Sequence, residues 1–222
     1  MDDPAGRLAP LLARLLAATG TAVPAGAVGR ILAWLVAVEG WRRRVDLTAA
    51  RSDAELVDLL VADAAVLACR LPAAARVVDV GSGAGAPGLP LGLLRPDLAL
   101  TLAEPRQKRA ALLRVALGRL AGPDGPPPAR LLGERGQELV RRAERFEVAL
   151  SRAALPPERW LRLGAALAPE GDVWVLLARQ EPPSLQGWRC CTDLRYRWPL
   201  TGAERRAACF CSAAAATSPG GP

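Results

Sequence analysis

A short stretch near the middle of the chain changes from apolar to glycine-rich within a few residues, and it limits what the chain can fold into. Arg76 to Val80 is a β-branched run typical of a buried parallel strand, and Gly81, Gly83 and Gly85 follow at alternate positions. Glycine lacks a Cβ and accepts positive φ, so backbone N–H groups there can approach a ligand beside the next helix's N-terminus. We therefore predict a strand, a ligand-binding loop and a helix.

The spacing of this motif is DxGxGxG, with Asp79 on the strand, and it differs from the GxGxxG that holds a dinucleotide pyrophosphate. A carboxylate would repel a pyrophosphate, whereas it suits a ligand with a cationic amino-acid end. A second acid, Glu104, follows the next apolar strand at Ala99 to Ala103, where a ribose diol is usually bound. The pattern favours S-adenosylmethionine (SAM) as the cofactor over a glycine-rich turn in another α/β protein.

Length and composition suit one α/β domain with a small extension, because 222 residues with 51% hydrophobic residues can bury a substantial core. No apolar run reaches the roughly 18 residues of a membrane span, and the N-terminal acids differ from a secretory signal. We therefore expect a cytoplasmic protein with no membrane partner. The five cysteines include no CxxC pair, which favours reduced thiols and indicates neither a disulfide framework nor a metal site.

The charge balance is basic, with a formal net charge of +7 and a pI of about 10.1, and this favours an anionic partner such as nucleic acid. Every basic residue except Lys108 is arginine, which also fits a GC-rich coding bias, so charge alone leaves RNA binding and a solvated surface both open. Placement suggests two candidate RNA contacts. They are the run Arg42, Arg43 and Arg44 beside the core, and Arg106 with Lys108 on a basic amphipathic helix predicted at Arg106 to Ala121.

The first 70 residues show helical spacing and predict an N-terminal helical cap. Its helices are expected at Arg7 to Ala18, Ala27 to Val38 and Asp53 to Arg70, the last capped by Ser52 or Asp53. Trp34 and Trp41 are seven residues apart and can share a helix face, where core packing and base stacking are both open.

Strands then alternate with helices over residues 71–211, which predicts a Rossmann-like, doubly wound domain followed by a flexible tail at 212–222. We expect a seven-stranded, mostly parallel sheet with a terminal antiparallel hairpin. Ligands bind at the carboxyl ends of such strands, so the Gly81 loop, Glu104, Glu134 to Gln137 and Arg152 should meet there. Besides the two strands given above, the expected strands are Arg130 to Leu132, Phe146 to Leu150, Asp172 to Ala178, Arg189 to Trp198 and Arg206 to Cys211.

Several segments, in the same order, resemble the glucose-inhibited division protein B family (RsmG), whose members methylate guanine N7 in small-subunit ribosomal RNA. The resemblance covers roughly residues 30–211. It is carried by VDLTA from Val45, DVGSGAGAPGLPL from Asp79, EPRQKRAALL from Glu104, GERGQEL from Gly133, FEVALSRA from Phe146 and the later GAERRAACF.

The resemblance implies a class I SAM-dependent methyltransferase with 16S rRNA or the small ribosomal subunit as partner. It implies cofactor contacts at Gly81, Ala86, Gly136, Gln137 and Arg152, with Glu104 as the ribose acid. The chain departs from the family's usual residues at Asp46, Leu60, Ala86 and Gln137.

The chain contains no histidine and only one tyrosine, so reactions that need a general base near neutral pH are disfavoured. Guanine N7 carries an in-plane lone pair and needs positioning instead of a base. Arg135 or Arg152 could hydrogen-bond guanine O6 or hold a phosphate, which makes them the candidate catalytic residues. A SAM- or RNA-binding relative without activity and a small-molecule methyltransferase are the alternatives, and we expect a monomer without metal.

Overall fold

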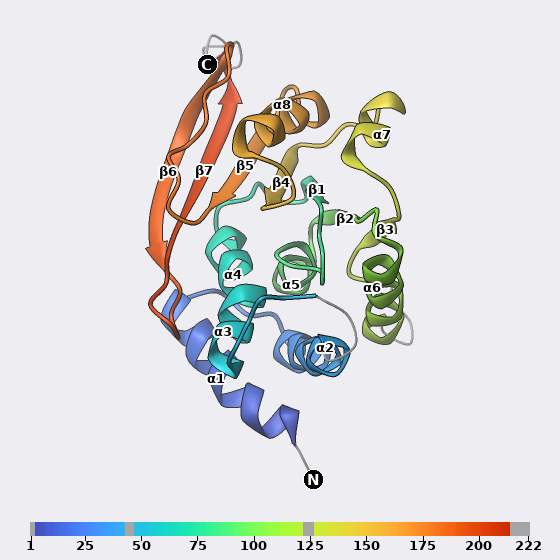
Figure 1. Cartoon of the computed structure of the whole chain (residues 1–222), viewed down its shortest axis with the longest axis vertical. Coiled ribbons are helices and arrows are strands. Elements are labelled where there is room, and N and C mark those ends of the chain that lie inside the picture. Colours follow the sequence, from blue (N-terminus) through green and yellow to red (C-terminus); the bar gives the residue numbers. More distant parts are fainter. Residues whose placement is uncertain (1–2, 43–46, 122–126, 214–222) are drawn as a thin grey trace.

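The computed structural model describes residues 3–42, 47–121 and 127–213, and seven strands within them form one sheet. The strands are β1 (Arg76–Val80), β2 (Ala99–Ala103), β3 (Arg130–Leu132), β4 (Val148–Arg152), β5 (Asp172–Leu177), β6 (Trp188–Arg197) and β7 (Glu204–Ser212). Their order is β3-β2-β1-β4-β5-β7-β6, with β1 to β5 parallel and β7 antiparallel to β5 and β6. The predicted sheet is confirmed, and Figure 1 shows the long β6–β7 hairpin along one edge of the molecule.

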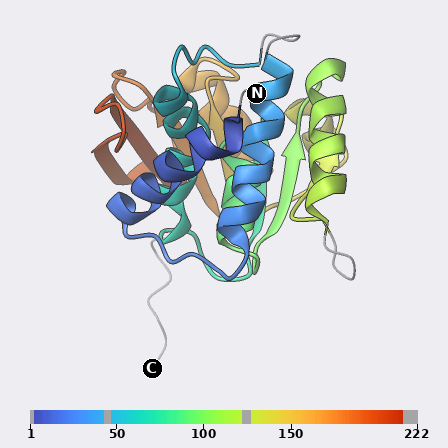
Figure 2. The ribbon, with the colours of Figure 1, turned by 90° about the horizontal axis from the view of Figure 1, so that it is seen from below.

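Helices cover both faces of this sheet. They are α1 (Pro4–Thr19), α2 (Ala27–Arg42), α3 (Asp53–Val57), the π-helix η1 (Asp58–Ala62), α4 (Asp63–Ala68), α5 (Gly88–Leu94), α6 (Gln107–Leu120), α7 (Gly136–Arg141) and α8 (Pro157–Leu167). In Figure 1, α7 and α8 lie on one side of the strands and the other helices lie on the opposite side. Figure 2 shows α1, α2 and α6 in front of the sheet when the molecule is seen from below.

The two faces of the sheet belong to two separate hydrophobic clusters, because successive side chains of a strand point to opposite faces. Val77 packs in the cluster that contains α1, α2, α4, α5 and α6, whereas Val78 packs in the cluster of α7 and α8. Both valines are fully buried, as a strand covered on both faces requires. The N-terminal helices share the first cluster with the sheet, so they form an integral layer of the core.

The predicted helix from Asp53 begins where expected. The Ser52 side chain accepts a hydrogen bond from the Glu55 backbone N at 3.1 Å, and a Glu55 carboxylate oxygen accepts one from the Arg51 backbone N at 2.9 Å. The structure divides this helix with the π-turn η1 and ends it at Ala68. A π-turn inserts one residue, which an apolar repeat in the sequence does not reveal.

Two further differences concern the second half of the sheet. The fourth strand, expected at Phe146 to Leu150, lies two residues later at Val148–Arg152, so Arg152 is part of the strand. Helix α7 (Gly136–Arg141) was not predicted, because six residues are too few for a helical repeat to be visible.

No helix among residues 3–42, 47–121 and 127–213 is long and apolar enough to cross a membrane.

Candidate functional site

A cavity of about 490 Å³ lies at the carboxyl ends of the parallel strands, within the ~300–1,000 Å³ typical of ligand sites. We call it the main cavity. It lies where the strand order reverses between β1 and β4, the usual ligand position in an open α/β sheet. The predicted site residues that line it are Gly81, Ala86, Glu104, Arg106, Arg135, Gly136, Gln137 and Arg152.

Three other predicted residues in the described part of the chain do not line this cavity. Lys108 is exposed on α6 and Arg42 ends α2, and neither lines the cavity. Arg43 and Arg44 fall outside the described residues. Glu134, which we expected at the site, is also absent from the lining and pairs instead with a neighbouring arginine.

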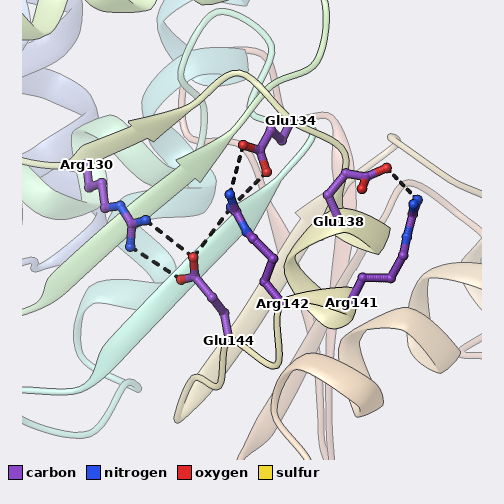
Figure 3. Close-up of polar contacts among 6 residues, drawn as sticks. All are labelled: Arg130, Glu134, Glu138, Arg141, Arg142 and Glu144. Carbon is purple, nitrogen blue, oxygen red and sulfur yellow. Dashed lines mark hydrogen bonds and ion pairs between the residues drawn. The ribbon is translucent and has the colours of Figure 1, made fainter.

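The partners of Glu134 form an ion-pair network on the surface beside β3 and α7 (Figure 3). Arg142 lies 2.7 Å from Glu134 and 3.5 Å from Glu144, and Glu144 also pairs with Arg130 at 3.3 Å. A separate pair joins Arg141 to Glu138. Because most of these side chains are well exposed, each pair adds little to stability. Glu134 is thus part of this surface network and not of the cavity lining.

The glycine loop wraps one side of the main cavity with its backbone. Gly81, Gly83 and Gly85 all have positive φ, at +76°, +61° and +111°. The Ser82 hydroxyl donates to the Asp79 carbonyl at 2.9 Å, and the indole N–H of Trp34 donates to the Ala84 carbonyl at 3.1 Å. These bonds fix the loop before any ligand arrives.

Trp34 itself is 1% exposed, so it packs in the core, and the alternative of base stacking at this residue is wrong. Through its bond to Ala84, the N-terminal helix α2 directly supports the loop of the sheet domain.

Asp79 does not face the cavity, contrary to the expectation that its carboxylate meets a cationic ligand. The residue is fully buried, and Oδ2 accepts a hydrogen bond from the Gly88 backbone N at 2.9 Å. Oδ1 has no hydrogen-bond partner among the described residues. Burial raises the pKa of this carboxyl group to about 7. The acid therefore supports the start of α5 from beneath the loop.

This raised pKa makes a pH-dependent contribution to stability. An acid whose pKa is higher in the folded protein than in the unfolded chain favours folding at low pH, and this contribution is lost as pH rises through about 4 to 7. Asp79→Asn removes the titration. We measure the free energy of unfolding of both proteins by chemical denaturation. As pH rises through that range, the value for the variant should increase by roughly 4 kcal/mol relative to the value for the parent, at 1.36 kcal/mol per pKa unit. A difference between the two proteins that stays constant with pH would show that the Asp79 pKa is normal.

Glu104 lies one residue beyond β2 and is only 2% exposed. Its Oε2 accepts from the Gly83 backbone N at 2.9 Å and its Oε1 from the Arg106 backbone N at 2.8 Å. A carboxylate offers about four lone-pair positions, so two remain for donors inside the cavity. The carboxylate is thus oriented by the glycine loop and lines the cavity beside it.

Arg152 ends β4 and lines both the main cavity and a neighbouring cavity of about 270 Å³. Its Nη1 donates to Asp63 Oδ2 at 2.9 Å and also to the Leu59 carbonyl in the π-helix. Asp63 is 2% exposed, and its Oδ1 accepts from the Tyr196 hydroxyl at 2.7 Å and the Trp198 indole at 2.9 Å. One buried carboxylate thus joins helix α4, strand β4 and the hairpin.

Burial and the neighbouring Asp63 raise the pKa of Tyr196, so this residue stays protonated near neutral pH. Two other carboxylates, Asp79 on β1 and Glu147 just before the neighbouring parallel strand β4, form no ion pair with Arg152. Glu147 pairs with Arg76 at 2.9 Å instead.

Sequence reasoning missed two contributions to this site. Arg109, on the basic helix predicted at Arg106 to Ala121, also lines the main cavity. Asp63 was not noticed, although an acid within an otherwise apolar helical stretch is a usable signal, because a buried charge needs a partner.

Arg42 remains a prediction as an RNA contact. Its guanidinium already pairs with Glu39, which is 3% exposed, and its Nη1 donates to the Ala50 carbonyl at 3.1 Å. An RNA contact at Arg42 would have to share the guanidinium with Glu39 and the Ala50 carbonyl.

Comparison with protein families gives a match to the model described as rRNA small subunit methyltransferase G, over residues 29–182. Three of the most similar relatives are named "Ribosomal RNA small subunit methyltransferase G". The protein of Anaeromyxobacter dehalogenans strain 2CP-1 is 37% identical over 63% of this chain and 64% of its own length, a little under two thirds. The protein of Anaeromyxobacter sp. strain Fw109-5 is 32% identical over 76% and 78%, and that of Myxococcus xanthus is 33% identical over 77% and 81%.

Solved structures with a similar fold have low sequence identity. A TehB-like SAM-dependent methyltransferase from Corynebacterium glutamicum has a TM-score of 0.53 at 15% identity, over 80% of this chain and 98% of its own. TrmN from Thermus thermophilus has a TM-score of 0.50 at 22% identity, over 71% of this chain and 48% of its own. At these identities the likeness concerns the fold, which is the class I methyltransferase fold that we predicted.

Proposed function

Because the chain belongs to the rRNA small subunit methyltransferase G family, we propose that it transfers a methyl group from SAM to small-subunit ribosomal RNA. The family match carries the proposal. It covers residues 29–182, and every residue that lines the main cavity falls inside that range. We therefore propose the main cavity as the place of this activity.

The residues around the main cavity suit SAM. The backbone of Gly81 and Gly83 would hold the amino-acid end, and the remaining lone pairs of Glu104 would accept from the ribose hydroxyls. Gly136 and Gln137, with Ala86, would border the adenine ring. When bound, SAM supplies an electrophilic methyl group on a sulfonium.

The finer proposal is that the acceptor is guanine N7. This atom has an in-plane lone pair and no proton to lose, so the protein must orient the base and exclude water. The chain fits this requirement because it lacks histidine, and its one tyrosine, Tyr196, stays protonated on Asp63. Arg152 and Arg135, which line the cavity, would orient the guanine through O6 or a neighbouring phosphate.

The test measures transfer of a labelled methyl group to naked 16S RNA, to small ribosomal subunits and to a sample without RNA. We expect label in RNA, and chemical cleavage at N7-methylguanosine should release it at one site. Label at another atom would overturn the assignment to N7. SAM binding without any label in RNA would overturn the proposed activity and support the inactive-relative alternative.

Arg106 and Lys108 are the exposed basic residues that we propose as RNA phosphate contacts beside the cavity. Replacing both with Gln should flatten the salt dependence of RNA affinity by about 1.4 units of slope, the value for two phosphate contacts to single strands. The measurement is a titration of labelled RNA at several salt concentrations.

The matched control replaces Arg189 and Arg195, two exposed arginines on β6, with Gln. It changes the net charge equally at the far edge of the sheet and should keep the parental slope. An equal flattening in both variants would mean that overall charge, and not this surface, determines RNA affinity.

A further inference from the structure

Three cysteines and one aspartate meet where β5 begins and β7 ends. Cys209 and Cys211 lie two apart on β7 and therefore point to the same face of the sheet, and Cys211 pairs with Asp172 across the β5–β7 ladder. A register shift between Cys190 and Thr192 on β6 marks a bulge around Cys191. The bulge brings the Cys191 sulfur to 3.7 Å from that of Cys209.

The spacing of these groups suits a metal ion. Ligand atoms of Asp172, Cys191 and Cys209 all lie within 4.8 Å of one another. Within the part of the chain that the structure describes, no other group of three such side chains is this close. A tetrahedral zinc ion with bonds of about 2.3 Å to sulfur holds two sulfurs about 3.8 Å apart. The Cys191–Cys209 separation of 3.7 Å therefore needs almost no movement.

The electrostatics of the cluster also favour a cation. Among the described residues, no arginine or lysine forms an ion pair with Asp172. Three groups that can become anionic are thus packed together without a positive partner, and a bound cation would supply the missing charge.

We propose that Asp172, Cys191 and Cys209 bind one divalent transition-metal ion of the zinc class, with Cys211 or a water in the fourth position. Two thiolates select a borderline-soft ion such as Zn²⁺ over Mg²⁺ or Ca²⁺, which prefer oxygen ligands. Each ion displaces two thiol protons, so affinity rises with pH.

The site is separate from the main cavity. Asp172 is the first residue of β5, whereas the cavity lies at the opposite, carboxyl ends of the parallel strands. Strand β6 is the edge of the sheet and is exposed along most of its length. A metal held between β5, β6 and β7 fastens this edge strand, so its role is structural.

The test uses the full-length protein, stripped of metal with a chelator and kept in a phosphine reductant. Calorimetry with Zn²⁺ should give one ion per chain, and Co²⁺ should give the thiolate charge-transfer and tetrahedral d–d bands. Cys191→Ser changes an exposed residue, so the variant should fold. Loss of a residue that only hydrogen-bonds to a metal ligand lowers metal affinity by ~10–100-fold. Loss of the ligand Cys191 itself should lower Zn²⁺ affinity by more than that.

Cys190→Ser is the matched control, because this neighbouring exposed cysteine is outside the cluster and its loss should leave Zn²⁺ binding unchanged. Zn²⁺ should also raise the melting temperature of the parent and of Cys190→Ser, but not of Cys191→Ser. The proposal is overturned if the parent binds no Zn²⁺, or if Cys191→Ser binds it as tightly as the parent. None of these measurements depends on methyl transfer.

Discussion

Gly81→Ala should bind SAM about 10- to 100-fold more weakly than the parent. The residue has φ of +76°, where a side chain is strained, and an added Cβ would lie 2.3 Å from the Ala154 Cβ. Backbone strain of this kind costs about 1–3 kcal/mol. The free variant can relieve it by moving the loop, and SAM binding must then restore the strained geometry, which lowers affinity tenfold for each ~1.4 kcal/mol. Both Gly81 and Ala154 line the main cavity, so relief of the clash must change its shape. Calorimetric titration with SAM measures the effect.

A second substitution separates the clash from the backbone strain. In Gly81→Ala with Ala154→Gly, the nearest remaining atom to the new Cβ is the residue-154 Cα at 3.5 Å, an ordinary contact. The double variant should therefore recover part of the affinity. Gly133→Ala is the control, since a Cβ there meets nothing within 4 Å, and it should bind SAM like the parent. Equal affinity of Gly81→Ala and the parent would remove Gly81 from the cofactor site.

The parts of the fold that could be predicted depend on patterns within a few residues. The strands β1, β2 and β3 have the predicted bounds, because each is a short apolar run between clear breaks. Glu104 and the Gly81 loop were correctly expected to be neighbours. Strands β1 and β2 pair in parallel, and the loop and Glu104 each lie just beyond the carboxyl end of one of them. Local sequence and the rules of parallel sheets were sufficient for this half of the site.

The parts that could not be predicted depend on contacts between residues far apart in the chain. Asp63 and Arg152 are separated by 89 positions, and their pairing requires helix α4 to pack beside the end of β4. The cysteine cluster likewise combines a bulge in one strand with two positions in another, so no CxxC spacing marks it. Asp79 was misplaced because its position beside the glycines says nothing about which face of the strand it occupies.

Arg152→Ala should abolish most methyl transfer to RNA at saturating SAM. The guanidinium lines the main cavity, with its side chain 20% exposed, and both of its hydrogen bonds to described residues come from Nη1. Nε and Nη2 are therefore the groups that we propose for the guanine or a phosphate. Arg152→Lys should restore only part of the activity, because an ammonium keeps the charge and loses the planar pair of donors. Initial rates of methyl incorporation, at a temperature where all variants are folded, measure this.

Stability changes in the same variants must be separated from a role in transfer. Removing one partner of a buried ion pair costs about 3–5 kcal/mol, so Arg152→Ala and Asp63→Asn should both melt at lower temperature. Asp63→Asn keeps Arg152 in the chain but loses the carboxylate that holds Nη1. We therefore expect it to slow transfer to RNA through a misplaced Arg152, with SAM affinity near the parental value.

Tyr196→Phe provides the matched control for this network. It removes a hydrogen bond to the same Asp63 carboxylate, but residue 196 does not line the main cavity. A lost hydrogen bond to a charged group costs about 1.5–3 kcal/mol, so this variant should lose stability and keep the parental transfer rate while it is folded. If methyl transfer instead falls in proportion to stability across Tyr196→Phe, Asp63→Asn and Arg152→Ala, then Arg152 serves the fold alone. If Arg152→Ala, and to a smaller extent Asp63→Asn, fall below Tyr196→Phe by more than their stability explains, the guanidinium acts on the RNA at the cavity.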